Sequence, residues 1–153
     1  MKHFLTLVIP ATVVGALFLT LAENGTAFAA DIIGRADKVV DGDTLWVCDQ
    51  TACHKIRLCG IDAPELESPK GIAARKALEA LVDGQTIRCM PVGEGTVCDG
   101  RSNRTSYDRI VAQCFADRTD LADELVSAGI ACDWVKFSGG HYSQDRPDLA
   151  CPR

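Results

Sequence analysis

The stretch VVDGDTLWV, residues 39–47, places two aspartates on either side of a glycine inside an apolar, β-branched run. Asp-Gly is a favoured centre for a two-residue hairpin turn, and the apolar residues on both sides predict the two strands of the hairpin. A turn explains Gly42 and one of the aspartates, because Asp and Gly are poor residues for a strand interior. It does not explain why both Asp41 and Asp43 are present.

Apolar periodicity predicts further strands and two helices around this hairpin. Strands are expected over residues 32–40, 45–48, 54–61, 85–90 and 107–116. A second helix, over residues 120–129, should follow a first helix that begins after Ser68, ends at Asp83-Gly84 and has an apolar face of Ile72, Ala73, Ala77, Leu78 and Leu81. Three strands, a helix and two strands are typical of an OB-type barrel. The predicted fold is therefore mainly β with helices: a five-stranded OB-type barrel with a helix between strands 3 and 4 and a short helix after strand 5.

The N-terminal segment, residues 1–29, has the layout of a secretory signal peptide. Lys2 precedes an apolar run of 19 residues, 4–22, and the small-x-small site Ala27-Phe28-Ala29 closes the segment. A run of this length also suits a membrane anchor, but Pro10 and the small residues after it favour cleavage.

Removing 29 of the 153 residues leaves 124, enough for one domain with one core. We predict one OB-fold domain over residues 30–136 and an irregular C-terminal tail over residues 137–153, pinned by a disulfide. The mature protein is expected to be secreted or periplasmic, monomeric, and without stable membrane association.

All eight cysteines follow residue 29, and an even number in a short exported chain indicates disulfide bonds. A zinc site is disfavoured, because no C-x-x-C pair occurs and neither histidine of the mature chain has a partner at zinc-finger spacing. Cys48 and Cys53 flank a short turn and are expected to pair, as are Cys89 and Cys114 on the fourth and fifth predicted strands. The other four allow three connectivities, in one of which Cys132 joins Cys151 and leaves Cys59 and Cys98.

The chain is acidic, with 16 basic and 21 acidic residues and a formal net charge of −5. The predicted signal peptide carries one basic and one acidic residue, so its removal leaves this charge unchanged. A net negative charge repels polyanions at long range, so activity on nucleic acid would depend on a local basic site and fall as salt rises. The candidate cations for such a site are Arg57, Lys70, Arg101, Arg104 and Arg109.

A second acidic segment, RLCGIDAPE over residues 57–65, follows the third predicted strand. Gly60 and Pro64 can bend the chain so that Arg57 and Asp62 reach the same end of the barrel. Four carboxylates then lie near one rim, and their mutual repulsion would be costly without a cation among them. Hard oxygen ligands favour Ca²⁺ or Mg²⁺ over zinc, although the spacing is not that of an EF-hand. The four carboxylates are those of Asp41, Asp43, Asp62 and Glu65.

Three motifs in this order, VVDGDTLWV, IRLCGIDAPE and YDRIVAQC, resemble the staphylococcal nuclease-like (thermonuclease) family over residues 39–134 or thereabouts. The resemblance implies a Ca²⁺-dependent phosphodiesterase on an OB barrel that cuts DNA and RNA.

The resemblance also implies a role for each matched residue. Asp43 and Asp62 would be carboxylate ligands of Ca²⁺ with the carbonyl of Ala63, and Asp41 would support the cation through water. Glu65 would act on the attacking water, Arg57 and Arg109 would hold the scissile phosphate, and Tyr107 matches a phosphate-contacting tyrosine. These roles suit the chemistry, since phosphodiester hydrolysis needs an activated water and cations that meet the charge growing on the phosphoryl oxygens.

The sequence departs from the family at several positions. Ser106 stands where better-known members carry a lysine, Val135 stands where they carry a second tyrosine, and SGGHYSQDRPDLACPR replaces their long C-terminal helix. An exported OB-fold module that binds oligonucleotide or oligosaccharide without cutting it is the alternative function.

Overall fold

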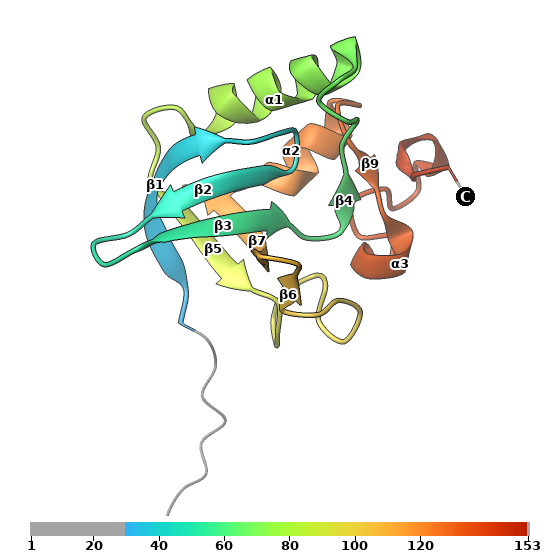
Figure 1. The fold of residues 1–153 in the computed structure, drawn as a ribbon. Coiled ribbons are helices and arrows are strands. Elements are labelled where there is room, and N and C mark those ends of the chain that lie inside the picture. Colours follow the sequence, from blue (N-terminus) through green and yellow to red (C-terminus); the bar gives the residue numbers. More distant parts are fainter. Residues whose placement is uncertain (1–29, 153) are drawn as a thin grey trace, which may run out of the picture.

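The computed structural model describes residues 30–152 (Figure 1). The predicted signal peptide lies outside these described residues. Between residues 30 and 152, no helix combines the length and the apolar character needed to cross a bilayer.

Five strands form a closed barrel, and the two-residue strand β4 (Ile61–Asp62) is not one of them. Antiparallel pairing joins β1 to β2, β2 to β3, β1 to β5 and β5 to β7, and parallel pairing of β3 with β7 closes the cylinder. The predicted five-stranded OB-type barrel is therefore confirmed. The barrel strands are β1 (Ile32–Val39), β2 (Thr44–Cys48), β3 (Cys53–Leu58), β5 (Ile87–Pro91) and β7 (Arg109–Ala116).

Two helices cover the barrel in the order that the sequence predicts (Figure 1). Helix α1 (Pro69–Val82) lies between β4 and β5, and the Ser68 hydroxyl caps it by accepting a hydrogen bond of 2.9 Å from the Gly71 N–H. Helix α2 (Leu121–Ser127) follows β7, and the Asp120 carboxylate caps it by accepting from the N–H groups of Ala122 and Asp123. Each helix thus begins where a side chain satisfies its free N–H groups.

The face that α1 turns to the core differs from the predicted one. Its buried residues are Gly71, Ala74, Leu78 and Val82, whereas Ile72 is 48% exposed and Ala73 is also on the surface. The prediction was wrong at these two positions because small residues, and not the largest apolar ones, face the barrel near the start of the helix. A Cβ atom on Gly71 would lie 1.9 Å from the carbonyl oxygen of Glu65, so α1 can approach the preceding segment only without a side chain there.

Several short elements were not predicted. The third predicted strand is divided at Cys59-Gly60 into β3 and β4 (Ile61–Asp62), and β4 pairs with β9 (Cys132–Asp133) in a separate two-stranded sheet. The others are β6 (Thr105–Ser106), β8 (Thr119–Asp120), helix α3 (Val135–Ser138) and the 3-10 helix η1 (Pro147–Leu149).

The C-terminal segment packs against the barrel beside β4 and β9 (Figure 1). Tyr142 and Leu149 are buried in the core, and α3 and η1 give regular turns to a region expected to be irregular. The carboxylate of Asp133, which is fully buried, accepts hydrogen bonds from the Ser138 hydroxyl and the Ser143 N–H. A polar segment is therefore held by buried hydrogen bonds in place of a long helix.

Four disulfides join all eight cysteines. The predicted Cys48–Cys53 and Cys89–Cys114 pairs are confirmed, and in each the two residues are direct cross-strand partners. Cys132 pairs with Cys151 and ties the C-terminal segment to β9. The remaining bridge, between Cys59 and Cys98, ties the loop after β5 to the end of β3.

Candidate active site

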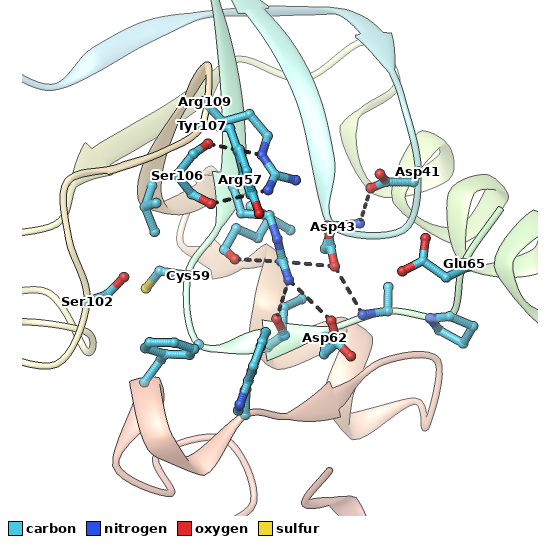
Figure 2. A pocket seen from close by; sticks show the side chains of 18 residues that line it. Asp41, Asp43, Arg57, Cys59, Asp62, Glu65, Ser102, Ser106, Tyr107 and Arg109 are labelled. Atoms are coloured by element: carbon cyan, nitrogen blue, oxygen red, sulfur yellow. Dashed lines mark hydrogen bonds and ion pairs between the residues drawn. The ribbon is translucent and has the colours of Figure 1, made fainter. Parts of the chain in front are cut away.

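A pocket of about 350 Å³ opens at the end of the barrel where the β1–β2 loop, β4 and α3 meet (Figure 2). The end of β3 and the start of β7 complete its wall. All eight residues to which the family resemblance gives a role line this one pocket: Asp41, Asp43, Arg57, Asp62, Ala63, Glu65, Tyr107 and Arg109. The other candidate cations, Lys70, Arg101 and Arg104, do not line it.

The β1–β2 loop gives its two aspartates different positions. The Asp41 carboxylate accepts a hydrogen bond of 3.0 Å from the Asp43 N–H and so stabilises the turn. The loop spans residues 40–43, two residues more than the Asp-Gly turn expected from the sequence. A Cβ atom on Gly42 would lie 2.5 Å from the Cβ of Ala74 and 2.7 Å from that of Ala63. The glycine is therefore required by close packing against α1 and the segment after β4.

The Asp43 side chain points into the pocket and is almost enclosed, with 6% of the residue exposed. Its carboxylate accepts hydrogen bonds from the Thr44 hydroxyl at 3.0 Å and the Ala63 N–H at 3.1 Å. Burial raises the pKa of Asp43 from 3.8 to about 6, since desolvation disfavours the charged form; Arg57 opposes the shift and Asp41 adds to it.

Arg57 contacts carboxylates on two elements, Asp43 in the β1–β2 loop and Asp62 in β4. Its Nη1 lies 2.9 Å from Oδ2 of Asp43, and its Nη2 lies 3.4 Å from Oδ1 of Asp62. The same guanidinium donates to the carbonyl oxygens of Leu58 and Ile61, both at 3.0 Å. Gly60 has a φ of 77°, which turns the chain after β3 so that β4 returns over the arginine. The bend that was expected to bring Arg57 and Asp62 together is confirmed.

Arg109 lies on the first residue of β7. Its Nη1 lies 3.3 Å from the Thr44 hydroxyl, and it donates to the Ser106 carbonyl at 3.4 Å and to the Ser106 hydroxyl at 3.3 Å. Ser106, at the position where a lysine was expected from the family, thus contacts the arginine. Tyr107 is 97% exposed at a φ of 56°, and its ring centroid lies 5.9 Å from the guanidinium carbon of Arg109.

The carboxylate oxygen atoms of the pocket could hold a hard cation. Asp41 and Asp43 come from the β1–β2 loop, and Asp62, whose side chain is 51% exposed, comes from β4. Figure 2 shows Glu65 on the same side of the pocket as Asp41 and Asp43. Carboxylate and carbonyl oxygens are the ligands that Ca²⁺ and Mg²⁺ prefer, so the donor set fits either ion. Arg57 lies between Asp43 and Asp62 and offsets part of their charge.

Sequence reasoning missed two aromatic residues of the pocket wall. Trp134 and Phe137 pack edge to face with ring centroids 4.7 Å apart, and both line the pocket. The main-chain N–H of Trp134 donates to the Gly60 carbonyl at 2.8 Å, which holds the start of α3 against the β3–β4 turn. Their spacing of three residues was a usable signal, because such residues share one face of a helical turn.

The known proteins and the family model that this chain matches, given below, carry nuclease names. A family model described as "Staphylococcal nuclease homologue" matches residues 55–149. An "Uncharacterized endonuclease" of Escherichia coli is 37% identical over 124 residues, which cover 80% of this chain and 69% of the relative. An "Uncharacterized endonuclease" of Haemophilus influenzae is 29% identical over 105 residues, 68% of this chain and 53% of the relative. "Probable staphylococcal-like nuclease CAN1" of Oryza sativa subsp. japonica is 30% identical over 99 residues, 63% of this chain and 24% of that protein.

Proposed function

Because this chain belongs to the staphylococcal nuclease homologues, we propose that it is an exported, Ca²⁺-dependent nuclease that hydrolyses phosphodiester bonds in DNA and RNA. The endonuclease names of its relatives support a phosphodiesterase-type enzyme. The observation that carries the proposal is the pocket itself, in which three aspartates and a glutamate lie beside two arginines. That combination matches the needs of phosphodiester hydrolysis: oxygen ligands for a cation, a base for water, and donors for the phosphate.

The proposed Ca²⁺ ligands are the carboxylates of Asp43 and Asp62 and the carbonyl oxygen of Ala63, with Asp41 acting through water. The donor set contains only oxygen atoms, which favours Ca²⁺ or Mg²⁺ over zinc, and the family resemblance favours Ca²⁺. When bound, Ca²⁺ would supply positive charge against the charge that develops on the phosphoryl oxygens.

Arg57 and Arg109 are the proposed phosphate-binding residues. A guanidinium is always charged and presents a planar fork of donors that matches two phosphate oxygens. Both side chains line the same pocket, and the contacts of Arg109 with Thr44 and Ser106, at 3.3–3.4 Å, are long for hydrogen bonds. Such weak contacts leave donors of Arg109 available to an incoming phosphate.

Glu65 is the proposed general base. It lies on the pocket wall and is exposed, so water can reach its carboxylate. Accepting a proton from the attacking water would make that water a better nucleophile.

Nucleic acid is the proposed substrate in spite of the net charge of −5. The exposed ring of Tyr107 beside Arg109 offers one stacking surface and one cation, a pairing suited to single strands. Four disulfides support export to an oxidising compartment, secreted or periplasmic, where the protein is proposed to act as a monomer.

The test is hydrolysis of single-stranded DNA by the oxidised protein, with Ca²⁺ and with a chelator. We expect cleavage only with Ca²⁺, a loss of about 100-fold or more in Glu65→Gln, and no loss in Glu67→Gln, which changes an exposed neighbour outside the pocket. Equal, chelator-insensitive cleavage by wild type and Glu65→Gln would overturn the mechanism. Oligonucleotide binding without any cleavage would assign the protein to the binding-module alternative.

A further inference from the structure

A second group of potential metal ligands lies next to the pocket, on the other side of Asp62. A carboxylate oxygen of Asp62 and the sulfur atoms of Cys132 and Cys151 all lie within 4.8 Å of one another. The two sulfurs are joined in a disulfide, and the Cys132 sulfur lies 3.5 Å from the main-chain oxygen of Asp62. The Asp62 side chain is 51% exposed and both cysteines are partly exposed, so solvent species can reach the group.

Main-chain contacts hold these three residues together independently of the disulfide. Asp62 and Cys132 are direct partners in the antiparallel β4–β9 pair. The Cys151 N–H donates to the Asp133 carbonyl at 2.9 Å, and a parallel bridge joins Asp133 to Ala150. Leu149, two residues before Cys151, is buried in the core. The two sulfurs would therefore stay close to Asp62 after the bond between them is broken.

We propose that reduction of the Cys132–Cys151 disulfide creates a binding site for a thiophilic divalent cation such as Zn²⁺. Two thiolates and the Asp62 carboxylate would be its protein ligands, with water in a fourth position. Ligand atoms around tetrahedral zinc lie roughly 3.3–3.8 Å apart, a spacing that this group reaches once the sulfurs separate from their bonded distance of 2.10 Å. A carboxylate and two thiolates are a donor set that zinc accepts and Ca²⁺ does not favour.

The chemistry balances with a phosphine or dithiol as reductant. A phosphine gives two electrons to the disulfide and becomes the phosphine oxide with an oxygen from water, and the water protons convert the two sulfurs to thiols. Binding of the cation then releases both thiol protons to solvent.

Only this disulfide combines access with a third ligand in the part of the chain that the structure describes. Both partners of Cys59–Cys98 and of Cys89–Cys114 are buried, which shields these bridges from a reductant. Cys48–Cys53 is accessible, but among residues 30–152 no other group of three such ligands is as close as that around Asp62. Cys48–Cys53 is thus an accessible disulfide for which no third such ligand of the described chain lies within 4.8 Å of both sulfur atoms.

The functional consequence rests on the proposed function, in which Asp62 is a Ca²⁺ ligand. A thiophilic cation held by Cys132 and Cys151 would occupy the same carboxylate. The nuclease would then be active when oxidised and inhibited when reduced in the presence of zinc, which confines its activity to oxidising compartments.

The experiment measures metal binding directly, so it does not depend on nuclease activity. The folded Cys48→Ser, Cys53→Ser variant is treated with a phosphine, and the two released thiols are counted. Co²⁺ is then added as a spectroscopic probe for the zinc site. We expect a thiolate-to-cobalt absorption band at one equivalent that Zn²⁺ abolishes, and at least about tenfold weaker binding after Asp62→Asn. Protein carrying Cys132→Ser and Cys151→Ser should give no band after the same treatment.

Two results would overturn the proposal. One is the absence of the band in reduced protein that has released two thiols. Detachment of the C-terminal segment after reduction would give this result and would also count against the proposal. The other is an equal band from the Cys132→Ser, Cys151→Ser protein. A protein that shows the band but never cleaves DNA would retain the metal site and contradict only the proposed nuclease function.

Discussion

The guanidinium of Arg57 and the carboxylate of Asp43 form an ion pair of 2.9 Å in which the two side chains are only 12% and 9% exposed. Because both charges have left water, each depends on the other for compensation. Arg57→Met should therefore lower the free energy of unfolding by about 3 kcal/mol, as measured by urea denaturation. Arg75→Met removes one partner of an exposed ion pair and should change it by less than about 1 kcal/mol. Equal effects of the two substitutions would contradict the burial argument.

The raised pKa of Asp43 makes stability depend on pH in a defined direction. The pKa is about 6 in the folded protein and near 3.8 in the unfolded chain, so the folded state holds the proton more tightly. The contribution of this group is fully present below pH 3.8 and is lost as the pH rises through about 6. Asp43→Asn stays neutral, so its free energy of unfolding should lack this pH-dependent decline of about 3 kcal/mol between acid pH and pH 7 without Ca²⁺. Urea denaturation from about pH 4 to pH 7 measures the difference; Asp99→Asn, at an exposed site, should track wild type.

Substitution of a metal ligand and substitution of the general base should impair hydrolysis in different ways. Asp43→Ala should weaken Ca²⁺ binding in calorimetric titration, and excess Ca²⁺ should restore part of the rate. Glu65→Gln keeps the shape but removes the basic oxygen, so it should bind Ca²⁺ normally and lose turnover that no excess of metal restores. Rescue of Glu65→Gln by added Ca²⁺ would place Glu65 among the metal ligands instead.

Arg109→Lys keeps the charge but loses the planar fork of donors. It should raise the barrier to hydrolysis by up to about 3 kcal/mol, the range found for preorganised donors, with little change in stability. Arg118→Lys, at an exposed position outside the pocket, is the control and should leave the rate unchanged. Hydrolysis of a short oligonucleotide under single-turnover conditions compares them, and an unaltered rate in Arg109→Lys would remove that arginine from phosphate binding.

Salt should suppress activity on long DNA. The net charge is −5, so attraction of a polyanion must come from a few local cations whose field is screened over about 10 Å at 0.1 M salt. Cleavage rates measured from low to physiological ionic strength should fall steeply at constant Ca²⁺. A salt-insensitive rate would mean that long-range attraction does not limit the reaction.

The sequence predicted the parts of the molecule that depend on local patterns. Alternating apolar residues indicated the barrel strands, and the residues around Gly60 indicated the bend that joins Arg57 to Asp62. Trp134 and Phe137 were not predicted as pocket residues, because their place in the pocket depends on β9, a strand of two residues that pairs with β4 far away in the sequence. The regular structure of the C-terminal segment was not predicted for a related reason. It depends on hydrogen bonds to the buried Asp133 carboxylate, and no local sequence pattern indicates them.

The parallel pairing of β3 with β7 sets the spacing of the two arginines. Arg57 is the register partner of Val111, two residues beyond Arg109, so both guanidinium groups leave the same face of adjacent strands. Their separation is a property of the sheet, and changes in loop length would not alter it. A slip of one residue between the strands would send one arginine to the opposite face. The Cys89–Cys114 disulfide fixes the register of β7 on β5 and so helps to keep Arg109 aligned with Arg57, although neither cysteine lines the pocket.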